Sequence, residues 1–137
     1  MSEGKAFIDT NLFVYLYSDT DAVKKEKVIQ EIDKYERFVS TQVLNEFCNV
    51  CIRKLKLPLS NIQSAITEIC KTCNLVVIDD TSVLKALAHH ERYEFSYYDS
   101  LIITSALESD CNYLLSEDMS DGQVINGVLS IRNIFAH

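Results

Sequence analysis

The chain has 137 residues and a formal net charge of −7, with 47% hydrophobic and 24% charged residues. These values predict one globular domain over residues 1–137, large enough for a proper core. They argue against a protein that coats nucleic acid through positive charge. Because no apolar run approaches the ~20 residues of a membrane span and the N-terminus lacks a secretory pattern, we expect a cytoplasmic protein with no membrane partner.

The first half of the chain alternates short apolar segments with longer amphipathic ones. We expect strands at residues 6–8 and 37–39. We expect helices at residues 11–17, from a cap at Asp19, Thr20 or Asp21 to about Tyr35, and from a cap at Ser40 or Thr41 to Leu55.

The second half repeats this alternation after a break at Pro58. We expect strands at residues 75–78 and 113–115 and around 128–131. We expect helices from Ser60 to Thr72, from a cap at Asp79 or Asp80 through Ala88, and from a cap at Ser96 through Leu107. Short apolar strands alternating with helices predict an α/β fold, in which helices cover both faces of a mostly parallel sheet of about five strands.

Four of the five cysteines form two pairs, Cys48-x-x-Cys51 and Cys70-x-x-Cys73, with the spacing of a zinc ribbon. Both pairs lie inside uninterrupted helical patterns, whereas zinc knuckles are tight turns. The pattern therefore favours core packing, because free cysteine is among the most buried residue types. A zinc site and a redox or disulfide role remain the alternatives, and the odd count fits a reducing compartment.

The most informative feature is a set of acidic residues at the junctions of the predicted elements: Asp9, Glu46, Asp99 and Asp118. A parallel sheet gathers its strand ends beside one crevice, so these carboxylates are expected to converge. Two such charges repel by about 4 kcal/mol at ~4 Å and an effective dielectric of ~20. A hard divalent cation such as Mg²⁺ or Mn²⁺ relieves that repulsion. The set therefore predicts a metal-dependent enzyme, and metal-assisted hydrolysis is the reaction class that it supports.

Each acid also has a purely structural explanation. Asp9 could cap the helix that follows it, and Glu46 could be an exposed helical residue. Asp99 has the spacing of a capping box with Ser96. Asp118 lies in a polar segment that could be a simple turn. These explanations weaken in combination, because three of the acids follow the same order of apolar segment, acid and new element.

Four segments resemble the motifs of PIN-domain ribonucleases. They are Phe7-Ile8-Asp9-Thr10-Asn11, Val43-Leu44-Asn45-Glu46-Phe47, Ser96-Tyr97-Tyr98-Asp99-Ser100-Leu101-Ile102, and Leu114-Leu115-Ser116-Glu117-Asp118-Met119 with Gly122. Their order and spacing look most like VapC-type toxins of bacterial toxin–antitoxin pairs, over almost the whole chain. The position before the third acid, often Trp in these toxins, is Tyr98 here.

The resemblance implies a three-layer α/β/α domain that cleaves RNA endonucleolytically with Mg²⁺ or Mn²⁺. It also implies a cognate VapB-type antitoxin across the active-site groove, and a toxin homodimer. Asp9, Glu46 and Asp99 match the three core acids of the family, and Asp118 matches its more variable fourth. The expected supporting residues are Thr10, Asn11 and Ser116, and the expected RNA-binding residues are Arg53 and Lys54.

Two other classes of function stand beside the nuclease. The first is a catalytically inactive PIN-like module that binds RNA or protein, against which the retention of all four acids argues. The second is a phosphotransfer domain of receiver or phosphatase type. Phosphotransfer chemistry requires a second acid at the position of Asn11 and a lysine after a late strand, and the sequence has neither.

Overall fold

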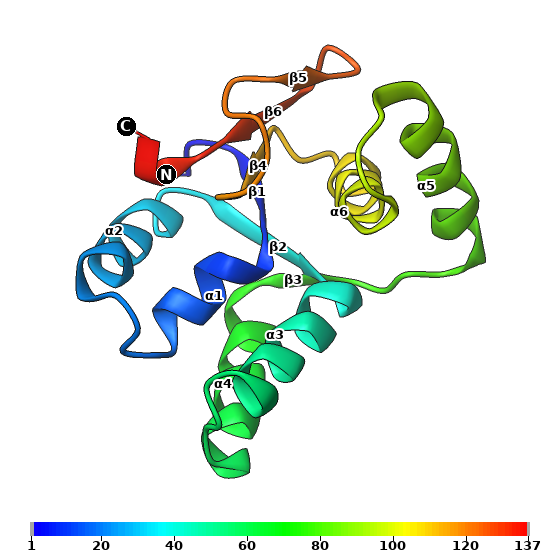
Figure 1. The fold of residues 1–137 in the computed structure, drawn as a ribbon. Coiled ribbons are helices and arrows are strands. Elements are labelled where there is room, and N and C mark those ends of the chain that lie inside the picture. The colour runs from blue at the N-terminus through cyan, green and yellow to red at the C-terminus, as the bar shows by residue number, and fades with distance from the viewer. Residues whose placement is uncertain (1, 137) are drawn as a thin grey trace.

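The computed structural model describes residues 2–136 and is built on a six-stranded sheet in the order β3-β2-β1-β4-β6-β5 (Figure 1). The strands are β1 (Lys5–Ile8), β2 (Glu36–Ser40), β3 (Asn74–Val76), β4 (Tyr113–Leu115), β5 (Val124–Ile125) and β6 (Leu129–Arg132). All neighbouring pairs are parallel except β5 with β6. The predicted mostly parallel sheet is therefore confirmed.

Helices flank this sheet on both sides, which gives the expected three layers (Figure 1). They are α1 (Thr10–Leu16), α2 (Ala22–Ile32), α3 (Thr41–Arg53), α4 (Leu59–Thr72), α5 (Asp80–Tyr93), α6 (Tyr97–Glu108) and the 3₁₀ helix η1 (Ile134–Ala136). Helices α1 and α2 lie on one side of the sheet, and α5 and α6 on the other. Within residues 2–136 no helix combines the length and the hydropathy that crossing a bilayer demands.

Most predicted helix caps are present, and they fix where the helices begin. Asp21, Ser40, Asp79 and Ser96 each accept a hydrogen bond from the backbone N–H three residues later. Helix α4 differs, because it begins at Leu59 after Pro58 and has no side-chain cap. Proline at this place sets the backbone angle without a side-chain hydrogen bond.

The core holds the two central strands rigidly. Phe7, Ile8, Leu114 and Leu115 are fully buried, and residues 101–106 of α6 are buried on every side of that helix. Because β1 and β4 are neighbours at the centre of the sheet, their carboxyl ends are the best-fixed points of the fold.

The cysteine pairs contribute to packing in three of four positions. Cys51 and Cys73 belong to the core, and Cys48 packs against it, as expected. Cys70 is exposed on α4, so the packing explanation is wrong for this residue. All the cysteines are free thiols.

Two parts of the sheet differ from the sequence-based expectation. Strand β3 ends at Val76, and Val77 and Ile78 lead away from it towards α5, where the N–H of Ile78 bonds to Oγ1 of Thr41 at 3.3 Å. Strand β5 was not expected. It pairs with β6 through a hairpin whose central residues, Asn126 and Gly127, have φ of 52° and 70°. An Asn-Gly pair is the usual signal for such a turn, so the sequence carried the information.

Candidate active site

The sheet reverses its winding between β1 and β4. From β1 the chain crosses to β2 and β3, and it then returns to place β4 on the opposite side of β1. Open parallel sheets form a crevice at the carboxyl ends of the strands at such a switch point. Ile8 pairs with Leu115 there, and the N–H of Asp9 bonds to the Leu115 carbonyl at 3.0 Å. The next residues along both strands, Asp9 and Ser116, are therefore neighbours at the crevice.

Asp9 is held through both carboxylate oxygens. Oδ1 accepts from the N–H of Thr10 at 2.7 Å, which also caps α1, and Oδ2 accepts from the hydroxyl of Ser116 at 2.8 Å. Burial raises the pKa of Asp9, and the nearby Asp99 and Asp118 raise it further, while the two hydrogen bonds lower it. Asp9 therefore does cap a helix, as its structural explanation required, and it also interacts with two other predicted acids.

Asp118 lies on the loop after β4 and faces α1. The side-chain amide of Asn11 donates to its Oδ2 at 2.7 Å. One residue earlier, Glu117 anchors the loop, because it accepts from the hydroxyl of Tyr15 at 2.6 Å and pairs with Lys24 on α2. Glu117 and Lys24 could not be identified from the sequence, since no spacing pattern links residues 93 positions apart in the chain.

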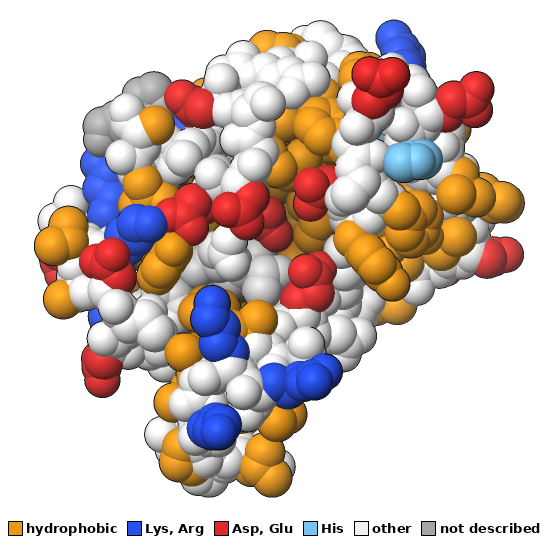
Figure 2. Space-filling model, viewed as in Figure 1, with side chains coloured by type: hydrophobic (Ala, Val, Ile, Leu, Met, Phe, Trp, Pro, Cys, Tyr) orange, Lys and Arg blue, Asp and Glu red, His pale blue; other side chains and the backbone are white. Residues whose placement is uncertain are grey.

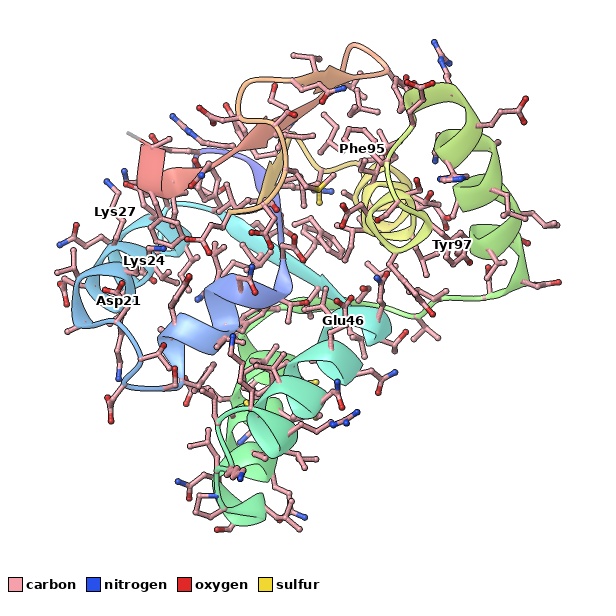
Figure 3. The ribbon with its side chains drawn as sticks, viewed as in Figure 1. Asp21, Lys24, Lys27, Glu46, Phe95 and Tyr97 are labelled. Carbon is pink, nitrogen blue, oxygen red and sulfur yellow. The ribbon has the colours of Figure 1, made fainter. Side chains whose placement is uncertain are left out.

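Glu46 approaches from α3, near the end of that helix closest to the sheet (Figure 3). Its Oε1 accepts from the amide of Gln42 at 2.8 Å, and the same amide nitrogen lies 3.1 Å from the Tyr98 carbonyl at the start of α6. Burial raises the pKa of Glu46, as do the charges of Asp9 and Asp99, against the lowering effect of Gln42. Gln42 therefore links the helix that carries Glu46 to the helix that carries Asp99.

Asp99 is half-buried in the first turn of α6. Its backbone N–H donates to Oγ of Ser96 at 3.1 Å, which is one half of the capping box that the spacing suggested. Among residues 2–136 its carboxylate makes no reciprocal hydrogen bond to Ser96, so the capping box does not account for the acid. The carboxylate instead raises the pKa of both Asp9 and Glu46.

These four residues, Asp9, Glu46, Asp99 and Asp118, are called the acidic centre below. Figure 2 shows acidic side chains gathered across the middle of one face, beside a hollow with hydrophobic walls. Within the part of the chain that the structure describes, no three acidic, histidine or cysteine side chains stand at distances that already enclose an ion.

The chemistry of the acidic centre fits a hard divalent cation. Its donors are carboxylate oxygens, which Mg²⁺ and Mn²⁺ prefer. Burial, and after it the neighbouring negative charges, raise the pKa of Asp9 and Glu46. Oγ1 of Thr10, beside Asp9, is buried and has no hydrogen-bond partner among the described residues.

The two expected RNA-binding residues lie outside the acidic centre. Arg53 ends α3 and Lys54 follows it, and both are exposed. Glu46 and Arg53 are seven residues apart, which places them on one face of the helix, roughly 10 Å apart along its axis. Figure 2 shows basic side chains below the acidic band, over the α3 and α4 end of the molecule.

His89 and His90, which are adjacent on α5, differ in their surroundings. His90 is exposed. His89 is partly buried between α5 and α6, with Nδ1 lying 2.8 Å from Oγ1 of Thr104, and burial lowers its pKa.

Known proteins resemble this chain chiefly in structure. The toxin–antitoxin complex from Klebsiella pneumoniae superposes with a TM-score of 0.71 at 18% identity, covering 94% of this chain and 97% of that one. VapC20 of Mycobacterium tuberculosis, described as a sarcin-ricin loop cleaving toxin, gives 0.66 at 16% identity over 82% and 91%. VapBC2 of Rickettsia felis, bound to promoter DNA, gives 0.65 at 15% identity over 94% and 99%. No curated protein sequence matches the chain.

These likenesses concern the fold, since the identities are low. The sequence itself supplies a second link, because the profile of the PIN domain matches residues 6–120. That stretch runs from β1 past Asp118 and so includes the whole acidic centre. The chain belongs to the PIN domain family.

Proposed function

We propose that this chain is an endoribonuclease that depends on Mg²⁺ or Mn²⁺, and that it is the toxin of a toxin–antitoxin pair of the VapC type, with residues 1–137 forming one cytoplasmic domain. The observation that carries the proposal is the pair of hydrogen bonds between the exits of β1 and β4, from Ser116 to Asp9 and from Asn11 to Asp118. Gln42 in addition joins the helix of Glu46 to that of Asp99. Beyond the effect of burial, the charges of Asp99 and Asp118 raise the pKa of Asp9, and the charges of Asp9 and Asp99 raise the pKa of Glu46. Carboxylates arranged so that they oppose one another's ionisation are typical of functional sites.

In the proposed reaction Asp9 and Asp99 hold the divalent ion, with Glu46 and Asp118 completing its surroundings. When bound, the ion supplies positive charge that stabilises negative charge developing on a phosphate oxygen, and it makes a water molecule more acidic. A carboxylate of the acidic centre would accept the proton of the water that attacks phosphorus. The P–O bond to the leaving ribose oxygen would then break, and that oxygen would take up a proton from solvent. Ser116 fixes Oδ2 of Asp9 and Asn11 fixes Oδ2 of Asp118, so both oxygens are oriented before substrate arrives.

The proposed partners follow from the descriptions of the solved structures that this chain resembles. One is described as a toxin–antitoxin complex and another as a VapBC pair on promoter DNA. We therefore expect a VapB-type antitoxin to bind this chain. A homodimer is also part of the proposal. Leu84 and Leu87, which are exposed and three residues apart on one face of α5, offer an apolar surface on which two copies can associate.

The decisive test is RNA cleavage by the purified chain with Mg²⁺, with Mn²⁺ and with a chelator. We expect cleavage that stops with chelator and that falls by at least ~10²-fold in Asp99→Asn, since one ligand charge is lost. Asp80→Asn is the matched control, because Asp80 also lies in the first turn of a helix but on α5. The free energy of unfolding of both variants should lie within ~0.5 kcal/mol of that of the parent protein, because neither side chain belongs to the core.

Two results would contradict the proposal. Full activity of Asp99→Asn in clean Mg²⁺ buffer would remove Asp99 from the reaction. Metal-dependent RNA binding without any cleavage would favour the inactive RNA-binding module instead.

A further inference from the structure

A cavity of about 570 Å³ opens beside the acidic centre, and the proposed chemistry does not use it. It lies between α3, the link from β3 to α5, and the start of α6. Gln42, Asn45, Glu46 and Asn49 form its α3 wall, and Ile78 and Tyr98 form the opposite wall. Its volume falls within the ~300–1,000 Å³ of small-molecule pockets.

The composition of this side cavity limits what can bind there. The lining contains no lysine or arginine, so it lacks the cations that a phosphate group requires. It offers instead the side-chain amides of Asn45 and Asn49, the apolar surface of Ile78 and the ring of Tyr98, which is 66% exposed. Amides that both donate and accept, together with an aromatic ring, suit a flat, neutral and polar-edged heterocycle.

The structure holds the walls of the cavity in place. Gln42 donates to Oε1 of Glu46 and to the carbonyl of Tyr98, so it ties the two walls together. The ring of Tyr97 contacts that of Tyr98 edge-on, with centroids 5.4 Å apart. Oε1 of Gln42 is buried and has no hydrogen-bond partner among the described residues.

We propose that the side cavity binds one nucleobase of the RNA, next to the phosphodiester that lies at the acidic centre. The base stacks on Tyr98, and Asn45 and Asn49 hydrogen-bond to its edge. Glu46 lines both the cavity and the acidic centre, so a base in the cavity places the adjoining phosphate beside the carboxylates. This inference rests on the proposed function and adds a preference for the base beside the cleaved bond.

The binding part of the test needs no cleavage. The four ribonucleosides, adenosine, guanosine, cytidine and uridine, are titrated separately into the metal-free chain while the side-chain amide signals are followed by NMR. We expect the signals of Asn45 and Asn49 to move, most with one or two of the nucleosides, and not to move in Tyr98→Ala. The amide of Asn61, exposed on α4, is the internal control and should stay in place. If all four nucleosides leave Asn45 and Asn49 unmoved, the inference is wrong, whether or not the chain cleaves RNA.

The cleavage part uses short RNAs randomised around the cut position. Tyr98→Ala should lower kcat/KM by roughly 5- to 150-fold, the equivalent of the ~1–3 kcal/mol that stacking contributes. It should also weaken the preference at one position beside the cut. Tyr98→Phe keeps the ring and should keep the preference, and Leu59→Ala at the start of α4 serves as the exposed-side-chain control.

The remaining outcomes separate this inference from the proposed function. If nucleosides shift the NMR signals of Asn45 and Asn49 but the wild-type chain cleaves no RNA, base binding in the cavity is supported and the nuclease proposal is refuted. Cleavage with an unchanged base preference in Tyr98→Ala, Asn45→Ala and Asn49→Ala would refute the cavity alone. If those variants weaken only the affinity for a co-expressed antitoxin, the occupant is protein and the inference is overturned.

Discussion

The hydroxyl of Ser116 donates a 2.8 Å hydrogen bond to Oδ2 of Asp9, although 107 residues separate them in the chain. A second bond of equal sequence separation, from Asn11 to Asp118, lies beside it. Both join the exit of β1 to the exit of β4, and both use carboxylate oxygens of the acidic centre. The parallel pairing of two buried strands therefore determines the orientation of two carboxylates at once.

The Ser116–Asp9 bond predicts a role for Ser116 that is separate from stability. Ser116→Ala should lower kcat/KM by ~10–100-fold, the usual cost of losing a group that supports a metal ligand. The hydrogen bond lowers the pKa of Asp9, so its loss should move the acidic limb of the pH–rate profile to higher pH. Ser109→Ala is the control, because Ser109 also donates a hydrogen bond but lies at the far end of α6. An unchanged pH profile in Ser116→Ala would contradict this role.

The raised pKa of Asp9 predicts that the charged form destabilises the fold. A carboxyl whose pKa is higher in the folded than in the unfolded protein stabilises the fold at low pH, and this contribution is lost as the pH rises through the raised pKa. Asp9→Asn should therefore increase the free energy of unfolding at pH 7 by about 0.5–2 kcal/mol in chelator. The gain should shrink as the pH falls towards 3.8, the ordinary pKa of the group.

Urea unfolding at pH 7 and at pH 4 measures this difference. Added Mg²⁺ should stabilise the parent protein and leave Asp9→Asn nearly unaffected, because an ion that binds only the folded state raises stability. If Asp9→Asn is less stable than the parent at pH 7, the prediction is wrong. The hydrogen bonds of Asp9 would then stabilise the fold by more than the burial of its charge destabilises it.

Much of this fold could be predicted from local signals. The caps at Asp21, Ser40, Asp79 and Ser96 precede clear apolar periodicities, and a cap acts within one turn of its helix. Strand β5 was not predicted, because its two residues are too few to show an alternating pattern. The Asn-Gly pair of the turn that follows was nevertheless visible in the sequence. Strand β3 ended early because Ile78 bonds to Thr41, a tertiary contact that no local pattern reports.

The acidic centre was predictable for a different reason. Asp9 and Asp118 follow apolar strands, and the sheet topology brings strand ends together whatever the intervening sequence. The residues that orient the carboxylates were harder to find, since Gln42 and Lys24 act through contacts across 56 and 93 residues. Asn11 and Ser116 were identified through the family resemblance, and no spacing rule indicates their hydrogen bonds.

The ion pair between Lys24 and Glu117 predicts a positioning role at a distance from the reaction. It fixes the loop that carries Ser116 and Asp118, and the Glu117 carboxylate raises the pKa of Lys24, so the lysine stays charged through the neutral range. Lys24→Met and Glu117→Gln should each lower kcat by ~10-fold, the lower end of the range for supporting groups, with little change in KM. The double variant should lose no more than the worse single one, because both remove the same contact.

Lys34→Met is the matched control for this ion pair. Lys34 pairs with Glu31 at 3.0 Å near the opposite end of α2, so its loss should leave kcat unchanged. Additive losses in the double variant, or a rise in KM at constant kcat, would mean that Lys24 contacts RNA directly instead of positioning the loop.

The face of α3 predicts which basic residue follows the RNA backbone. One stripe along α3 begins at the acidic centre, and its residues recur at helical spacing: Gln42, Glu46, Asn49 and Arg53. Lys54 lies off this stripe.

The binding of single-stranded RNA tests this difference in an Asp99→Asn background. Arg53→Ala should weaken binding and reduce the slope of log K against log salt by roughly 0.7, the value for one phosphate contact on a single strand. Lys54→Ala should have a smaller effect. Lys71→Ala on α4 is the control for general loss of charge. Filter binding at four salt concentrations measures the slopes, and equal slopes for Arg53→Ala and Lys71→Ala would remove Arg53 from the RNA path.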